Sequence, residues 1–249
     1  MSALAHYLEA EGVPAVAISL IRIHAEKVGP PRALWVPFEL GRPLGAPRDA
    51  AFQTRVIVAA LRLLEAPQGP VLLEDFPEDD PTGVDRPNWR PPFDLSPGAL
   101  DGSDRAATER ALLEEAAAIR PLHERFVAAN RRTTVGLSAL GVEECVTLVA
   151  ASMAASGVPP SSRDYPAGPV QTLRWAVDDL KAYYLEAMSA DGAIPSSRQM
   201  QNWFWDKTLL AQAIIALRRQ LLASDDKRSQ AIGRMNLVPG AQVQRLGLQ

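Results

Sequence analysis

The sequence predicts an α/β protein in which a small parallel sheet at the N-terminus is followed by a mainly helical region. Apolar extended runs alternate with helical segments near the start, residues 67–103 are rich in proline, and apolar residues recur at helical spacing from residue 104 onward. We therefore divide the chain into an α/β half-domain (1–66), a connector that wraps the core (67–103) and a helical region (104–249). With 249 residues, of which 47% are hydrophobic, the chain is long enough for one large core or two small ones.

The half-domain alternates between helices and buried strands. The pattern predicts a helix over residues 3–10, a fully apolar strand over 15–21, a second extended run over 33–38 and a long amphipathic helix over 49–65. Strands that are apolar throughout are typical of parallel sheets covered on both faces, so we expect a partial Rossmann-like sheet. Ligands bind such sheets at the carboxyl ends of the strands, usually in the first strand-to-helix loop, and here that loop would precede Met1.

The connector is defined by its prolines. Proline fixes φ and removes a backbone donor, so neither a helix nor a central strand can run through it. Its apolar residues, Trp89 and Phe93 among them, favour a segment that wraps the core rather than a free linker, with residues 71–73 as an edge strand.

The remainder of the chain has helical periodicity. Pro121 is expected to kink or split the first helix, and the β-branched run 133–137 is compatible with a short strand. A last short helix is expected to follow Asp226 and to end near Met235. The longer helices are expected over residues 104–129, 142–155, 170–189 and 196–223.

Composition excludes several classes of protein. The formal net charge of −3 and the scattered 26 Lys and Arg residues argue against a nucleic-acid partner. No apolar run approaches the ~20 residues that a bilayer crossing needs, and the charged residues near the start exclude a secretory signal, so we expect a cytoplasmic protein. The single cysteine, Cys145, excludes an internal disulfide and a zinc site of paired cysteines, and no cofactor is expected.

The best candidate site is the loop over residues 41–47. Its glycines, Gly41 and Gly45, can let the backbone approach a ligand, and Arg42 can pair with a substrate carboxylate. The alternative is a rigid turn that orients the next helix, since glycine and proline are the commonest turn residues. His24 is a further candidate because it follows the first strand at its carboxyl end, where with Arg22 and Lys27 close by it can meet an anionic group; a solvated loop histidine is the alternative.

Two other features have simpler explanations. Cys145 lies in the first turn of its helix, but the flanking Glu143 and Glu144 would raise its pKa, so we interpret it as a buried small hydrophobe. The aromatic run 203–205 can contribute to a cation–π cage, but helix packing is the favoured interpretation.

A set of residues with characteristic spacing runs through the first quarter of the chain. They are Leu8, Glu9, Gly12, Val13, Pro14, Pro31, Arg32, Leu34, Gly41, Pro43, Leu44, Gly45, Pro47, Ala60, Leu61, Leu63, Leu64 and Glu65. In this pattern the chain resembles the carboxyl-terminal part of the glycine/sarcosine/betaine reductase selenoprotein B family. The resemblance implies reductive cleavage of a small amine-type substrate by a selenocysteine or cysteine just before the helix that here begins at Ala3. That residue is absent, so no catalytic residue is assigned.

Two functions follow. The chain is expected to be part of a selenol- or thiol-dependent reductase with a dithiol electron partner, inactive as residues 1–249 alone, or else a non-catalytic binding module derived from that fold. In the first case the sheet would lack a preceding strand and expose an apolar edge at residues 15–21, so we expect a poorly soluble or oligomeric protein.

Overall fold

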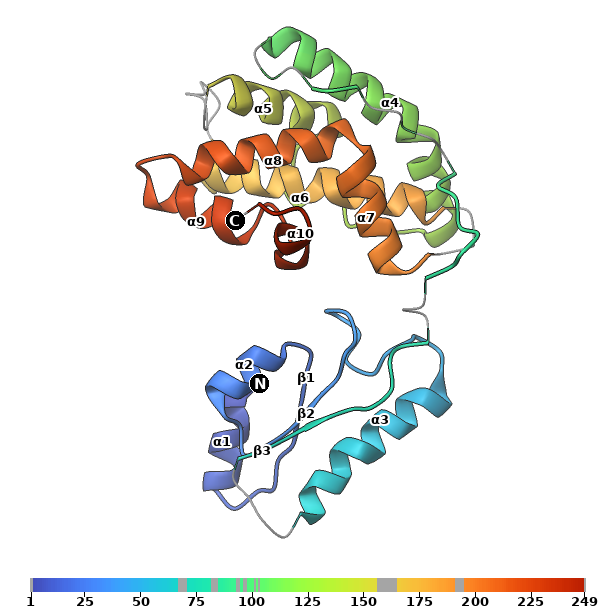
Figure 1. The fold of residues 1–249 in the computed structure, drawn as a ribbon, viewed down its shortest axis with the longest axis vertical. Helices are drawn as coiled ribbons and strands as arrows, with labels where there is room; N and C mark the ends of the chain where they lie inside the picture. Colours follow the sequence, from blue (N-terminus) through green and yellow to red (C-terminus); the bar gives the residue numbers. More distant parts are fainter. Residues whose placement is uncertain are drawn as a thin grey trace. The chain divides into compact units, whose positions relative to one another are not determined.

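The computed structural model describes residues 2–66, 71–81, 85–92, 95, 98–100, 102, 104–155, 165–190 and 195–248. The chain forms two compact units, Met1–Asp85 and Arg86–Gln249 (Figure 1). The described parts of the connector belong to both units. A strand near residue 72 joins the first unit, whereas Trp89, Leu95 and Leu100 pack against the core of the second.

The first unit contains a three-stranded parallel sheet, which confirms the predicted α/β class. The strands are β1 (Ala17–Ser19), β2 (Arg32–Trp35) and β3 (Leu72–Asp75), in the order β1-β2-β3. β3 is therefore an edge strand, as expected. The strands are shorter than the apolar runs that predicted them, because the ladder between β1 and β2 pairs only Ala17–Ser19 with residues 33–35.

Helices lie on either side of these strands. α1 (Ser2–Ala10) and α2 (Arg22–Val28) lie on one side and α3 (Ala50–Arg62), which continues as the 3-10 turn η1 (Leu63–Glu65), lies on the other (Figure 1). The sequence did not predict α2, because Ala25 is its one buried residue and no apolar stripe marks it. The core between the sheet and α3 contains three phenylalanine rings, Phe38, Phe52 and Phe76, with centroids 5.4 to 6.0 Å apart.

The regular elements among the described residues of the second unit are all helices. Its core includes Leu173, Leu180, Ile214 and Leu217, all fully buried. The helices are α4 (Arg105–Asn130), α5 (Val142–Ala154), α6 (Pro169–Met188), α7 (Ser197–Lys207), α8 (Leu209–Leu222), α9 (Lys227–Met235) and α10 (Gly240–Arg245).

The structure differs from the expectations for these helices in three places. Of the two outcomes expected at Pro121, a kink or a split, the split does not occur, because α4 remains one helix. Residues 133–137 form no strand, because their polar groups bond to carboxylates of α6 instead. The helix expected over 196–223 is two helices, since Thr208 has an extended backbone and caps α8 by accepting the Ala211 N–H at 3.0 Å.

The aromatic run 203–205 packs within the helical core. Trp203, Phe204 and Trp205 are all buried, and the Phe204 ring lies edge-on to Tyr184 with centroids 5.7 Å apart. Helix packing, the favoured interpretation, therefore describes these residues.

Candidate functional site

The carboxyl ends of the three strands form one edge of the sheet. The Val36 N–H donates to the Ser19 carbonyl at 2.9 Å, and the Phe76 N–H donates to the Trp35 carbonyl at 2.8 Å. These bonds align the ends of β1, β2 and β3. The edge is where a parallel sheet with helical connections binds its ligands.

Two charged residues at this edge are already paired with each other. The Arg22 Nε donates to both carboxylate oxygens of Asp75, at 3.1 and 3.2 Å, and Arg22 also pairs with Glu26. The charge of Arg22 is therefore matched within the protein. The expectation that Arg22 assists His24 in meeting an anion is not supported by this arrangement.

The loop that follows β2 is held by successive turns. The Arg42 N–H donates to the Glu39 carbonyl at 3.0 Å, and the Gly45 N–H donates to the Arg42 carbonyl at 2.9 Å. Gly41 and Gly45 have left-handed backbones, with φ of 90° and 79°. Such a backbone disfavours residues with a Cβ, so both glycines are conformationally required.

Gly45 also joins the loop to the core. A Cβ at this position would lie 2.5 Å from Cε1 of Phe52, whose ring is buried against Phe38 and Phe76. The Ala46 carbonyl accepts a hydrogen bond from Gln53 Nε2 at 2.8 Å. The loop is thus fixed to the first turn of α3 on its inner side.

The outer side of the loop carries two arginines. Arg42 and Arg48 are both exposed, and Arg48 has a left-handed backbone with φ of 66°. A non-glycine residue in this region stores strain and is worth examining as part of a site. Sequence reasoning missed Arg48, although its place between Pro47 and the helix-capping Asp49 marks a constrained turn.

The N-terminus of α3 is not open to a ligand. Asp49 accepts the Phe52 N–H through its side chain and the Gln53 N–H through its carbonyl, both at 2.9 Å. Because the capping carboxylate already occupies the helix end, an anion at this loop would bind the arginines and not the helix N-terminus.

His24 stands apart from the loop. It lies exposed in α2 and makes no side-chain hydrogen bond or ion pair among the described residues. The structure therefore gathers Gly41, Arg42 and Gly45 in one loop and shows no contact that joins His24 to them.

Cys145 has the properties of a core residue. It is buried in α5, and its Sγ lies 3.5 Å from Ser138 Oγ. Burial raises the pKa of the thiol to about 11, and the nearby carboxylates of Asp179 and Glu144 contribute in the same direction. A thiol of this kind is protonated at neutral pH and is a poor nucleophile.

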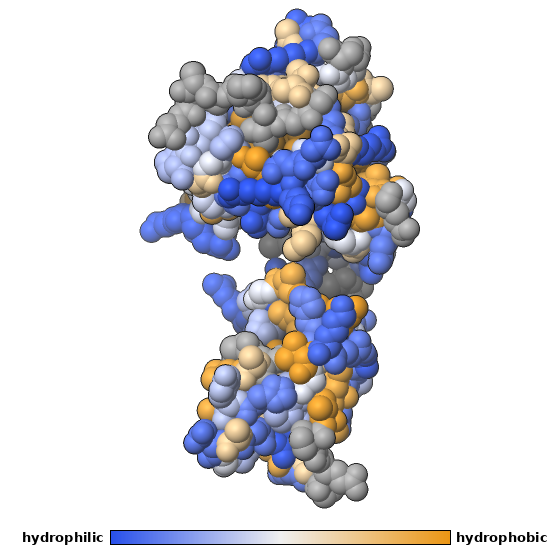
Figure 2. Space-filling view, turned by 90° about the vertical axis from the view of Figure 1, so that its left-hand side faces the viewer, coloured by the Kyte–Doolittle hydropathy of each residue, from blue (hydrophilic) through white to orange (hydrophobic). Residues whose placement is uncertain are grey.

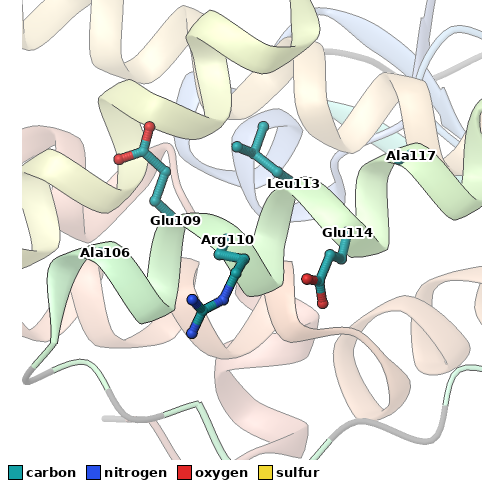
Figure 3. A pocket seen from close by; sticks show the side chains of 6 residues that line it. All are labelled: Ala106, Glu109, Arg110, Leu113, Glu114 and Ala117. Atoms are coloured by element: carbon teal, nitrogen blue, oxygen red, sulfur yellow. The ribbon is translucent and has the colours of Figure 1, made fainter.

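A hollow of about 460 Å³ lies over one face of α4 (Figure 3). The described residues that line it all come from this helix, and Figure 3 shows Arg110 and Glu114 pointing away from the side that Glu109 occupies. Glu109 accepts a hydrogen bond from Thr147 at 2.7 Å. The described lining residues offer no nucleophile and no convergent set of polar groups. The residues are Ala106, Glu109, Arg110, Leu113, Glu114 and Ala117.

The described residues contain no group of three or more side chains placed to hold a metal ion. None of the helices in the same residues combines the length and apolar character of a membrane span. Comparisons with models of protein families, with curated protein sequences and with solved structures find no match for this chain.

Proposed function

We propose that this chain is the substrate-binding part of a selenol- or thiol-dependent reductase, and that the loop over residues 41–47 binds the carboxylate of a small amine-type substrate. The observation that carries the proposal is a pair of exposed arginines, Arg42 within the loop and Arg48 directly after it, where the loop follows β2 and contains two glycines with left-handed backbones. A guanidinium presents its donors in a planar fork that matches a carboxylate.

The reacting group comes from outside the described residues in this proposal. Cys145 belongs to the other unit, is buried, and has a pKa of about 11. The reductase would therefore need a selenol or a reactive thiol, and a dithiol as electron donor, from a partner polypeptide. This chain would orient the substrate.

The alternative is a binding module without redox chemistry. It is favoured by the same property of Cys145, since a protonated thiol leaves no reacting group among the described residues. The two proposals share the ligand site and differ only in the partner.

The ligand site is tested by titrating the full chain with glycine, sarcosine and betaine in calorimetry, with choline as the analogue that lacks a carboxylate. We expect saturable binding of at least one amino acid and none of choline. Arg42→Gln and Arg48→Gln should each weaken binding about tenfold or more, whereas Arg62→Gln, at an exposed arginine in the last turn of α3, should not. Equal binding of choline, or no binding of any ligand, would overturn the site.

The reductase is distinguished from the module by purifying the native protein and measuring the intact mass of the chain and of every polypeptide that copurifies with it. A selenium atom or a further reactive cysteine, on the native chain or on a copurifying polypeptide, supports the reductase. A native chain without such a group and without such a polypeptide, together with ligand binding, supports the binding module.

A further inference from the structure

A second hollow lies in the helical unit, between the end of α8 and the segment that follows α10. Its volume is about 410 Å³, within the range of about 300 to 1,000 Å³ that small-molecule sites occupy. Two neighbouring arginines and three apolar side chains form most of its wall. The lining residues are Arg218, Arg219, Leu222, Ala223, Gly247 and Leu248.

Arg218 is the unusual member of this set. Its side chain is buried, with 7% of the residue exposed, and Nη1 donates to the Leu248 carbonyl at 2.7 Å. The Nε–H has no acceptor, and no carboxylate pairs with this guanidinium in the part of the chain that the structure describes.

Other arginines show that the missing carboxylate is the informative feature. The Nε atoms of Arg32 and Arg174 also lack an acceptor, but Arg32 pairs with Glu9 and Arg174 pairs with Asp178. Arg218 is thus buried as deeply as a core residue, while its charge has no counter-charge among the described residues. A buried charge without a partner is strongly unfavourable, and a single carbonyl satisfies one of its five donors.

The surroundings of Arg218 favour an anion with an apolar body. Arg219 is exposed beside it and adds a second positive charge to the same wall. Leu222, Ala223 and Leu248 offer apolar surface in the same hollow. An oxyanion would supply the missing counter-charge, and an attached apolar group would cover these three side chains.

We propose that this hollow binds an organic anion whose carboxylate or phosphate head pairs with Arg218 and Arg219 and whose short apolar body lies against Leu222, Ala223 and Leu248. The site belongs to the helical unit and is independent of the loop proposed to bind substrate in the α/β unit.

The test is a calorimetric titration of the full chain with octanoate and with octyl phosphate, each at two salt concentrations. We expect one or both to bind, with an affinity that falls as salt rises. Octan-1-ol, which lacks the anionic head, and inorganic phosphate, which lacks the body, should each bind about tenfold more weakly or worse. Comparison of octanoate with octyl phosphate shows which head group the site prefers. Equal affinity for octan-1-ol, or no binding of either anion, would overturn the proposal.

Substitutions inside and outside the hollow test where the anion binds. Arg219→Gln, an exposed position, should keep the fold and weaken binding of the anion about tenfold, whereas the matched change Arg234→Gln, at an exposed arginine of α9 outside the hollow, should leave the affinity unchanged. Arg218→Met should abolish binding and raise the midpoint of thermal unfolding, because it replaces an unpaired buried charge with an apolar chain of similar length. An Arg219→Gln protein that binds as tightly as the wild type would place the anion elsewhere and contradict the assignment.

Discussion

Gly45 is the residue on which the geometry of the candidate loop depends most directly. Gly45→Ala should lower the free energy of unfolding by about 2–3 kcal/mol. The left-handed backbone disfavours any Cβ, and this Cβ would meet the Phe52 ring at 2.5 Å. The ring cannot turn away easily because Phe38 and Phe76 pack against it. Urea denaturation measures the change.

Gly41 provides the matched control. It has a left-handed backbone as well, with φ of 90°, but a Cβ there would have no atom within 4 Å. Gly41→Ala should therefore cost only the backbone strain, about 1 kcal/mol. Equal losses for the two variants would show that Phe52 does not confine the loop.

Cys145 should be unreactive in the folded protein. Because burial raises its pKa to about 11, less than about 1% is thiolate at pH 8, and the sulfur is shielded from solvent as well. Iodoacetamide should therefore label Cys145 in urea but not in the native state, as followed by intact mass. Rapid native labelling would restore Cys145 as a candidate nucleophile and would favour redox chemistry within this chain.

At the scale of elements, the segment after α4 is held by two carboxylates of α6. Asp179 accepts the N–H groups of Gly136 and Leu137 at 2.9 and 2.8 Å. Glu186, two turns later on the same face of the helix, accepts Thr133 Oγ1 and Thr134 N, each at 2.7 Å. This arrangement explains why a β-branched run forms no strand.

Glu186 should make stability depend on pH. Burial raises the pKa of this carboxyl, but hydrogen bonds from Thr133, Thr134 and His123 outweigh burial, and the pKa lies below the usual 4.5. A lowered pKa in the folded state contributes stability above the unfolded value, and that stability is lost as pH falls through the folded value. Glu186→Gln should lower the free energy of unfolding by about 1–3 kcal/mol at pH 7. The difference in this free energy between the variant and the wild type, measured by urea denaturation, should become smaller below pH 4.5.

The control for this prediction is Glu114→Gln, at an exposed carboxylate of α4. It should leave both the stability at pH 7 and its acid dependence close to those of the wild type. A gap between wild type and Glu186→Gln that stays constant from pH 7 to pH 3 would contradict the hydrogen-bonded carboxylate.

The break between α7 and α8 depends on a carboxylate from α4. The buried Glu115 accepts the N–H groups of Leu209 and Leu210, at 2.7 and 3.1 Å, and the Tyr184 hydroxyl at 2.7 Å. Glu115→Ala should lower the free energy of unfolding by about 3 kcal/mol, because it leaves three donors without an acceptor. Tyr184→Phe removes one of these bonds and should cost about 1 kcal/mol. Thermal unfolding followed by circular dichroism measures the stability of both variants. Similar losses of stability in Glu115→Ala and Tyr184→Phe would show that the start of α8 does not need Glu115.

The sequence predicts those features that depend on neighbouring residues. Apolar runs and helical periodicity are local patterns, so the α/β class, α1, α3 and the edge strand are predictable from them. The position of Thr208 as a helix start is not, because Glu115, which bonds to the N–H groups that follow it, lies about 94 residues away in the chain. The short polar helix α2 buries only the Ala25 side chain, so its sequence contains no apolar stripe that would predict a helix.

The candidate site also combines features that the local sequence predicts with features that depend on residues far apart in the chain. Gly41, Arg42 and Gly45 form one loop because they are neighbours in the sequence. The pairing of Arg22 with Asp75 depends on the packing of β1, β2 and β3 side by side, which joins residues 53 positions apart. The left-handed backbone of Arg48 was not predicted from the sequence and is seen only in the structure.

At the scale of the whole molecule, the two units differ in how much apolar surface they expose. Among the described residues, Leu137 and Met235 are the exposed large hydrophobic side chains of the helical unit, and all the others lie in Met1–Asp85. Figure 2 shows hydrophobic side chains at several places on the surface of this smaller unit. Patches of this kind are typical of surfaces that bind another protein.

The clearest patch is on α1. Leu4, Tyr7 and Leu8 are spaced three and four residues apart, so they share one face of the helix, and all three are exposed. β1 forms the edge of the sheet opposite β3, and an edge strand is a position at which another chain can pair. Both features lie in the unit whose exposed edge led us to expect an oligomer.

We therefore expect the full chain to self-associate through the α/β unit. Sedimentation velocity should show species larger than a monomer whose proportion rises with protein concentration. The double change Leu4→Glu with Tyr7→Glu should shift the protein to the monomer, because charges on this face oppose its burial. Met235→Glu is the matched control, since Met235 and Tyr7 are both 74% exposed but lie in different units. A wild-type protein that stays monomeric at every concentration would contradict the expectation. Dissociation by Met235→Glu alone would instead place the contact on the helical unit, and the apolar face of α1 would then be free to bind the partner polypeptide that a reductase requires.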